Sequence, residues 1–217
     1  MILSSETAHP TAHPGAREAE GLAELLLRET VHRCSNDLQL VIGLLSLQAR
    51  RTRHAEAREV LQDAADRVGV LARARAASLH HDRATLGTAL RQVCEALHAQ
   101  AEPRSILLSL EVADGCDGLD GARIPAVALA VNELATNAIK HAFEADQGGH
   151  IRIFGRCNGD EIVVTVDDDG LPFPEPRPIP GEGLGLNLAK RIIQSNGGSL
   201  RPPQHGSKIF EIAVPRD

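Results

Sequence analysis

Residues 131–141, with the sequence VNELATNAIKH, decide the fold of the second half of the chain. Their apolar side chains recur at helical spacing, which predicts one face turned inward and one outward face carrying Asn, Glu, Lys and His. Amide and carboxylate oxygens on a helix suit a metal ion and its phosphate ligands better than plain water. We therefore expect a helix over about residues 125–143 whose polar face lines a binding site.

Two glycine-containing segments follow this helix. Residues 166–170 read VDDDG at the end of an expected strand, and residues 181–186 read GEGLGL at the start of an expected helix. Glycine lets a backbone approach a ligand closely, and a helix N-terminus favours an anionic phosphate group. The segment between them is short and rich in proline, which predicts a stiff loop.

In order and spacing, the three segments resemble the N, G1 and G2 boxes of the Bergerat-type (GHKL) ATP-binding domain, which histidine kinases share with gyrase and MutL. The resemblance implies ATP and Mg²⁺ as cofactors. It implies that Asn137 binds the magnesium ion, that Glu133 is a catalytic general base and that Asp168 hydrogen-bonds adenine. The other nucleotide-binding residues that it implies are Lys140, His141, Gly170, Gly181, Gly183, Leu184, Gly185 and Ser207. Pro172 departs from the family pattern, which has a glycine there.

The first half of the chain has the pattern of a helical hairpin. One helix is expected over about residues 20–53 and a second over about residues 55–78, with a short break between them. Apolar residues alternate at steps of four and three, which predicts packing against a partner helix. In the first helix these residues are Leu27, Val31, Cys34, Leu38, Val41 and Leu45. Two helices bury little surface, so a second copy completing a four-helix bundle, as a homodimer, is expected.

The first helix also carries the segment HRCSNDLQ at residues 32–39. It resembles the phosphoacceptor box of the HWE/HisKA_2 class of sensor histidine kinases, with the core His-Arg-x-x-Asn-x-Leu-Gln. The resemblance implies that His32 accepts a phosphoryl group, and a neutral imidazole does keep a free ring nitrogen for attack. Ser35 stands where the class usually has lysine. The general base for His32 stays open between Glu29 and Glu133.

These patterns predict an α+β protein in which an antiparallel helical hairpin precedes a Bergerat-type α/β sandwich, with helices on one face of a mixed sheet. We expect a disordered tail at residues 1–18, a dimerisation and phosphoacceptor hairpin at 19–80, a linker at 81–84 and the ATP-binding domain at 85–217. In that domain, helices are expected at 86–100 and 184–195, and strands at 105–112, 151–154, 161–166 and 209–214.

The composition of the chain argues against several classes of function and location. The net charge of −6, with acids and bases mixed along the chain, argues against nucleic acid as the ligand. The four cysteines are far apart and form no Cys-x-x-Cys pair, which indicates reduced thiols in a cytoplasmic protein. The N-terminus lacks the basic and apolar regions of a signal peptide, and no apolar run is long enough to span a membrane.

We therefore expect a histidine kinase of a bacterial two-component system. It would autophosphorylate His32 from Mg-ATP and pass the phosphoryl group to an aspartate on a response-regulator receiver domain. Its input would come from a separate sensor protein or from the docking state of the hairpin. A histidine phosphotransferase with a decayed ATP domain is the alternative. A serine/threonine-directed anti-sigma-factor kinase, or a binding module that sequesters a partner, is a third reading, which the hairpin bearing His32 disfavours.

Overall fold

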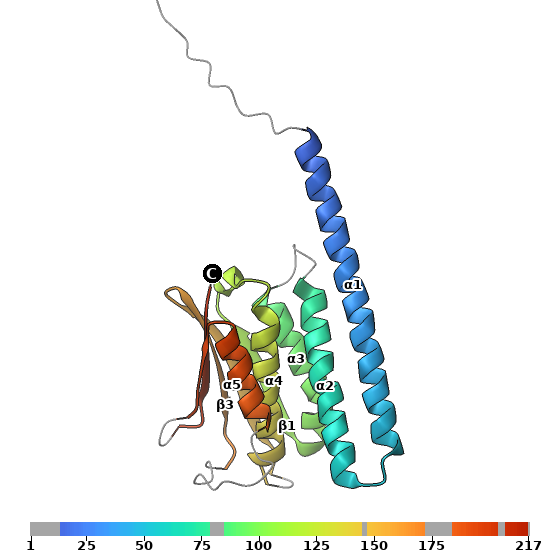
Figure 1. The fold of residues 1–217 in the computed structure, drawn as a ribbon. Helices are drawn as coiled ribbons and strands as arrows, with labels where there is room; N and C mark the ends of the chain where they lie inside the picture. Colours follow the sequence, from blue (N-terminus) through green and yellow to red (C-terminus); the bar gives the residue numbers. More distant parts are fainter. Residues whose placement is uncertain (1–13, 79–84, 145–146, 172–183, 204–206, 217) are drawn as a thin grey trace, which may run out of the picture.

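A computed structural model describes residues 14–78, 85–144, 147–171, 184–203 and 207–216. A two-helix hairpin lies alongside a sandwich of three helices and a five-stranded sheet (Figure 1). The order of layers is the sheet, then helices α3, α4 and α5, then α2, and finally α1 on the outside. The fold class predicted from the sequence is confirmed.

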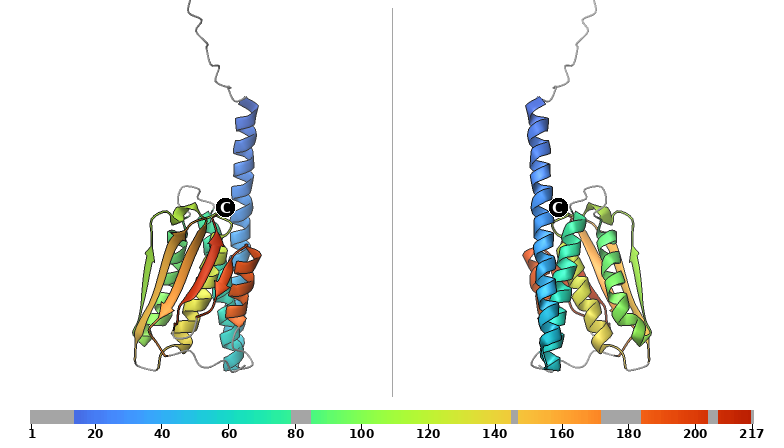
Figure 2. Two further views of the ribbon diagram at one scale, coloured as in Figure 1. Left: turned by 90° about the vertical axis from the view of Figure 1, so that its left-hand side faces the viewer. Right: turned by 90° about the vertical axis from the view of Figure 1, so that its right-hand side faces the viewer.

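The hairpin consists of α1 (Pro14–Arg51) and α2 (Ala55–Ser78), which turn back on each other over residues 52–54. Cys34, Leu38 and Leu45 are half-buried, as expected for the heptad seam, whereas Val41 is exposed. The N-terminal part of α1 extends beyond the rest of the molecule (Figure 2). The predicted tail is wrong for residues 14–18, which are helical, because proline at the first helical position and the Ala-Arg-Glu run after it favour a helix.

The sheet has the order β1-β2-β3-β5-β4, with β1 parallel to β2 and all other neighbours antiparallel. Its strands are β1 (Ile106–Val112), β2 (Gly149–Asn158), β3 (Glu161–Asp168), β4 (Ser199–Arg201) and β5 (Phe210–Pro215). The β2–β3 hairpin turns at Gly159, whose positive φ of 64° is strained for residues other than glycine. The three-residue strand β4 was missed because it is too short to show alternation.

The helices of the sandwich are α3 (Leu86–Ala101), α4 (Ile124–His141) and α5 (Leu184–Ser195), with short 3-10 turns at Glu102–Arg104 and Cys116–Gly118. Thr85 starts α3 through a capping box with Thr88. The guanidinium of Arg104 donates hydrogen bonds to the carbonyl oxygens of Ile139 and Phe143 at the end of α4, where a cation is favourable.

The core is almost entirely aliphatic, because the chain has no Trp or Tyr and Phe143 is the one buried aromatic side chain among the described residues. The fully buried large side chains come from α3, α4, α5 and one face of the sheet; they include Leu90, Leu97, Val127, Val131, Ile151, Ile153, Ile162, Ile193 and Ile212. Almost every residue of α4 up to Ala135 is buried, since the sheet covers one side of this helix and α2 the other. Among the described residues, no helix is both long and apolar enough to cross a membrane.

Candidate functional site

Asp168 lies at the end of β3 on the side of the sheet that the helices cover. Alternation along the strand places its side chain on the same face as Val164 and Val166, both buried, while Asp167 points to the opposite face. Asp168 is only 9 % exposed. Of the three consecutive aspartates, the structure therefore turns the one predicted from the sequence toward the helix layer.

Two groups contact the Asp168 carboxylate. The backbone N–H of Gly170 donates to Oδ1 at 3.1 Å, and the Lys208 ammonium lies 3.4 Å from the same oxygen. Asp169 instead accepts a hydrogen bond from the backbone of His150 at 2.7 Å, which holds the strand end in place. Both contacts of Asp168 are made by Oδ1, so the carboxylate keeps acceptor capacity at the strand end.

Gly170 packs directly against the end of α4. A side chain there would overlap the carbonyl oxygen of Ala142, which also accepts a hydrogen bond of 2.6 Å from the backbone of Leu171. The glycine is therefore required for the contact between the end of β3 and the end of α4. This contact brings Asp168 and the C-terminal half of α4 to the same edge of the molecule.

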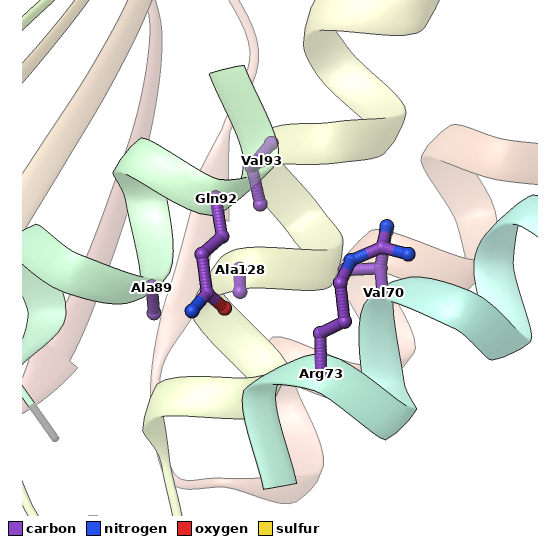
Figure 3. Close-up of a pocket in the computed structure, with 6 residues that line it drawn as sticks. All are labelled: Val70, Arg73, Ala89, Gln92, Val93 and Ala128. Carbon is purple, nitrogen blue, oxygen red and sulfur yellow. The ribbon is translucent and has the colours of Figure 1, made fainter. Parts of the chain in front are cut away.

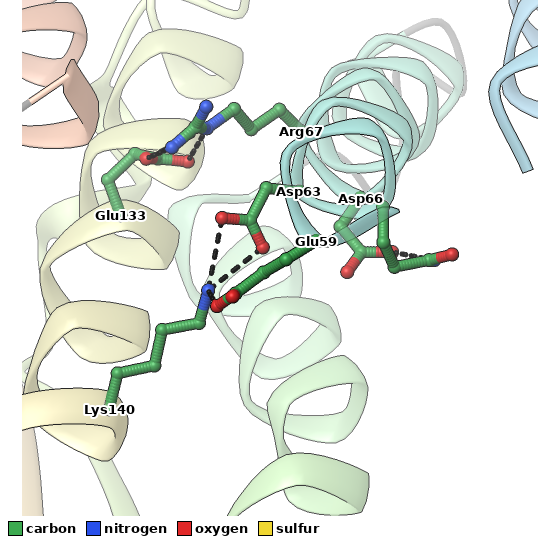
Figure 4. A network of polar contacts seen from close by, with 7 residues as sticks. Glu59, Asp63, Asp66, Arg67, Glu133 and Lys140 are labelled. Carbon is green, nitrogen blue, oxygen red and sulfur yellow. Dashed lines mark hydrogen bonds and ion pairs between the residues drawn. The ribbon is translucent and has the colours of Figure 1, made fainter. Parts of the chain in front are cut away.

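Glu133 is the most deeply buried of the predicted site residues on α4. We expected it on an outward polar face, but it is 3 % exposed, because α2 covers that face. The guanidinium of Arg67 on α2 reaches both of its carboxylate oxygens, with Nε at 2.9 and 3.0 Å (Figure 4). This hydrogen bond raises the pKa of Arg67 against the opposing effect of burial.

Lys140 lies two turns further along α4 and also contacts α2 (Figure 4). Its ammonium is 2.9 Å from Asp63 and 3.3 Å from Glu59. Burial lowers the pKa of Lys140, but the hydrogen bonds and negative charges of these two carboxylates outweigh it, and the net pKa is raised. The lysine is therefore held as a cation in contact with two acids.

The remaining predicted site residues differ in burial and in how fully the structure describes them. Asn137 is half-buried on α4 between Glu133 and Lys140, whereas His141 is exposed. The hydroxyl of Ser207 accepts a hydrogen bond of 3.1 Å from the backbone of Ile209. Gly181, Gly183 and Pro172 lie outside the described residues, as does the predicted linker, and Leu184 is described only through its backbone at the start of α5.

Gly185 brings the first turn of α5 against Glu133. A side chain at this position would overlap Oε2 of Glu133 and would come within 3.3 Å of the Arg67 guanidinium. The glycine therefore permits the close approach of α5 to the ion pair. Three segments distant in sequence, around Arg67, Glu133 and Gly185, meet at this point.

The donor set fits a magnesium ion only in part. Asn137 offers one amide oxygen, and magnesium commonly takes one or two protein ligands and completes its shell with waters and phosphate oxygens. No group of three or more His, Cys, Asp or Glu side chains capable of holding a metal ion occurs within the described ranges. A metal here would therefore need to arrive with phosphate groups.

His32 lies within α1, of which only the backbone is described at this residue. At the rise of an α-helix it is about 28 Å from the hairpin bend, whereas Asp63 on α2 is about 12 Å from it. The predicted acceptor is thus displaced by about 16 Å along the hairpin from the contacts of Lys140. One turn earlier, Glu29 binds Arg33 at 2.8 Å, so this candidate base is already paired.

Comparison with known families identifies the fold. Residues 47–196 match the histidine kinase-like ATPase domain family. The chain belongs to this family. The match includes α2, α4 and the end of β3, but it does not extend to His32 on α1.

Relatives of this ATPase-like chain carry kinase names. It is 33 % identical over 179 residues to the sensor histidine kinase PdtaS of Mycobacterium tuberculosis, covering 80 % of this chain and 36 % of that protein. It is 27 % identical over 203 residues to the blue-light-activated histidine kinase 2 of Erythrobacter litoralis, covering 87 % of this chain and 56 % of that protein. The chain thus spans about a third to a half of the length of these relatives.

A solved structure supports the same fold for this ATPase-like chain. The blue-light-activated histidine kinase of Erythrobacter litoralis superimposes with a TM-score of 0.61 at 20 % identity, covering 85 % of this chain and 59 % of that one. The isolated kinase domain of that protein gives a TM-score of 0.59 at 23 % identity, covering 83 % and 95 %. Because these coverages are larger than the share of the chain that forms the sandwich, the likeness extends into the hairpin.

Four residues that contact predicted site residues were not predicted from the sequence: Glu59, Asp63, Arg67 and Lys208. The first three repeat every four residues on α2, which places them on one helical face. That periodicity was a visible signal for a charged contact surface. Lys208 follows the predicted Ser207 directly, but nothing in its sequence position indicated the contact with Asp168.

A small cavity between α2, α3 and α4 is separate from these residues (Figure 3). Val70, Val93 and Ala128 line it, and Oε1 of Gln92 is buried there with no hydrogen-bond partner among the described residues. It has room for about one water molecule, which would satisfy this amide oxygen. A nucleotide does not fit, so the cavity is not a second candidate site.

Proposed function

We propose that the chain is the kinase core of a two-component system and that it transfers a phosphoryl group from Mg-ATP to His32. The observation that carries the proposal is the meeting of the N-box helix with the buried Asp168 in a chain of the histidine kinase-like ATPase family. The kinase names of its relatives support the same assignment.

Each side chain at the site has a role suited to its chemistry. Asp168, as a carboxylate at the strand end, accepts a hydrogen bond from the adenine amino group. Asn137 contributes an amide oxygen to a magnesium ion, which neutralises charge on the phosphates when it is bound. Lys140 and His141, one turn beyond Asn137, contact phosphate oxygens.

The glycine segments complete the nucleotide site in this proposal. Gly170 brings the end of β3 against α4. Gly181, Gly183 and Gly185 let the backbone before α5 approach the phosphates, together with Leu184 at the helix start, and the N-terminus of that helix favours their negative charge. Ser207 lies beside the last strand and helps to hold the adenine.

The transfer forms a bond between an imidazole nitrogen of His32 and the γ-phosphorus and breaks the bond to the β–γ bridging oxygen, so ADP leaves. Catalysis of this kind requires mainly positioning and charge stabilisation. Glu133 takes the proton of the attacking group or polarises it. A receiver-domain aspartate of a response regulator then accepts the phosphoryl group from His32.

A homodimer through the hairpin is part of the proposal. Leu40, Leu44 and Leu47 of α1 recur on one helix face and are 68, 61 and 43 % exposed, and Val60 of α2 is 59 % exposed. Apolar residues at steps of four and three on an uncovered helix face favour a partner helix. A second copy would bury them in a four-helix bundle.

A separate sensor protein supplies the input in this proposal, and a cytoplasmic location agrees with four cysteines that lie far apart in the sequence and form no Cys-x-x-Cys pair. The alternative, a phosphotransferase with a non-ATP-using domain, requires loss of nucleotide-binding residues. Asn137, Asp168, Gly170 and the three glycines of residues 181–185 are retained, which favours the kinase.

The test is autophosphorylation with labelled ATP and magnesium, for the wild type and for His32→Ala. His54→Ala is the matched control, since His54 is an exposed histidine in the turn of the same hairpin. We expect an acid-labile label on the wild type and on His54→Ala, and none on His32→Ala. Label retained on His32→Ala would overturn the acceptor. No label on the folded wild type would favour the phosphotransferase, to be tested with a phosphorylated receiver domain.

A further inference from the structure

A row of charged residues on α2 faces the N-box helix. Glu59, Asp63 and Arg67 follow one another at four-residue steps, and we call them the α2 charge row. All three bind residues of α4: Glu59 and Asp63 contact Lys140, and Arg67 contacts Glu133 (Figure 4). Asp66 lies on the same helix but points elsewhere, toward Gln62 at 3.1 Å.

The sign of each charge in the row corresponds to a part of a magnesium nucleotide. Two carboxylates approach the Lys140 ammonium, where the proposed function places phosphate oxygens. A cation sits on both oxygens of Glu133, which lies one turn before Asn137, the proposed magnesium ligand, on α4. The docked helix therefore places negative charge at Lys140 and positive charge beside Asn137, the signs of charge that phosphate oxygens and a magnesium ion would have there.

Burial makes this occupation exclusive. The Glu133 side chain is 4 % exposed under Arg67, and a buried carboxylate has no room for a second cationic partner beside a bidentate guanidinium. The Lys140 side chain is 28 % exposed and shared between two acids. Either ligand, α2 or a nucleotide, must therefore displace the other from these two groups.

We propose that α2 is an internal competitor of Mg-nucleotide: the docked hairpin occupies Glu133 and Lys140, and nucleotide binding and hairpin docking weaken each other. This inference rests on the proposed function of the same site. Two ligands that use the same groups are coupled reciprocally, so release of α2 tightens nucleotide binding and nucleotide binding loosens α2.

The docked state also separates donor and acceptor. His32 is offset by about 16 Å along the hairpin from the Lys140 contacts, and α2 lies between α1 and α4. Transfer to His32 of the same chain therefore requires α2 to leave α4. Competition between nucleotide and the α2 charge row for Glu133 and Lys140 couples that release to the arrival of the substrate.

The test compares affinity for a fluorescent ATP analogue with magnesium between wild type and the triple variant Glu59→Gln, Asp63→Asn, Arg67→Gln. Glu59→Gln and Asp63→Asn are near-isosteric, and Arg67→Gln introduces a shorter, neutral side chain; together they remove charge from α2 and leave the proposed nucleotide residues in place. Asp66→Asn is the matched control, because it removes one acid from the same helix without touching α4. We expect the Kd of the triple variant to fall about 5- to 10-fold and that of Asp66→Asn to stay unchanged.

A second variant and a second measurement guard against misfolding. Glu59→Gln with Asp63→Asn keeps Arg67 on the buried Glu133 and should lower the Kd by about 2- to 3-fold, with circular dichroism and a thermal melt reporting the fold. Hydrogen exchange in α2 of the wild type should rise when the analogue and magnesium are added, and exchange in α2 of the triple variant should already be high.

The outcomes separate this inference from the proposed function. Equal Kd values in wild type and both variants would overturn competition while leaving nucleotide binding established. A higher Kd in the triple variant would place α2 within the nucleotide site and would also overturn it. If none of the folded proteins binds the ATP analogue, both the proposed function and this inference are wrong.

Discussion

Ion pairs occur on two surfaces of the sandwich, and they connect different kinds of neighbour. On the open face of the sheet, Arg201 binds Glu211 at 2.7 Å across strands that backbone hydrogen bonds already join. On the helix face, Arg67 binds Glu133 across 66 residues of sequence, between helices that share no backbone ladder. An ion pair therefore adds to strands that are already hydrogen-bonded in the sheet, whereas on the helix face it holds α2 against α4.

The difference between the two surfaces indicates which ion pairs contribute to the docking of the hairpin on the sandwich. Solvated pairs between adjacent strands contribute little, because water screens them and ordering the side chains costs entropy. A pair with one buried partner contributes through the cost of leaving that partner alone. Only the helix-face pairs involve predicted site residues, so docking and function share the same groups.

Breaking one pair on each surface gives the largest predicted contrast. Arg67→Ala leaves the Glu133 carboxylate buried and unpaired, and we expect it to lower the free energy of unfolding by about 2 kcal/mol, because Arg67 itself is partly exposed. Arg201→Ala, with an arginine side chain 63 % exposed, should cost less than about 1 kcal/mol. Urea denaturation measures both, and equal losses would contradict the distinction.

The pH dependence of the Lys140 contacts gives a second test of the contrast between the two surfaces. The pKa of Lys140 is raised in the folded state, so its pairing stabilises the fold fully below the ordinary value of 10.5 and is lost as pH rises through the folded value. Lys140→Met should cost about 1 kcal/mol at neutral pH, after allowance for solvent screening, and progressively less above pH 10.5. A difference between the two melting curves that stays constant at all pH values would argue against the pairing.

The smallest effect is expected for the pair on the sheet. A double-mutant cycle with Arg201→Gln and Glu211→Gln should give a coupling below about 0.5 kcal/mol that disappears in high salt. Glu211 also lies 3.8 Å from Arg156, which further reduces its dependence on a single partner. A coupling as large as the loss for Arg67→Ala would remove the contrast between the two surfaces.

Much of the sandwich could be predicted because its residues follow simple periods. The apolar run of β3 and the helical spacing of α4 both depend on local sequence, so the positions of these elements came from pattern. The choice of Asp168 among three consecutive aspartates came from the family resemblance. Gly159 at the β2–β3 turn and Gly197 after α5 both have a positive φ, which glycine adopts readily, so these element ends also depend on local sequence.

The burial of Glu133 could not be predicted in the same way. A polar stripe on a helix indicates which residues leave the apolar core, but it does not reveal whether a second layer covers them. That layer is α2, whose contacts to α4 join residues 66 to 81 positions apart. Long-range docking of this kind depends on the relative placement of two folded units, which local periodicity does not encode. The same limit hid the contact of Lys208 with Asp168.

The aliphatic core has a practical consequence. Without Trp or Tyr, the chain is almost dark in the near ultraviolet, and its concentration must be determined by other means than aromatic absorbance. The lack of native tryptophan fluorescence is useful, because a single tryptophan introduced at an exposed position of α2 would be the only tryptophan that emits. Its spectrum would follow the movement of one helix without background from any other part of the protein.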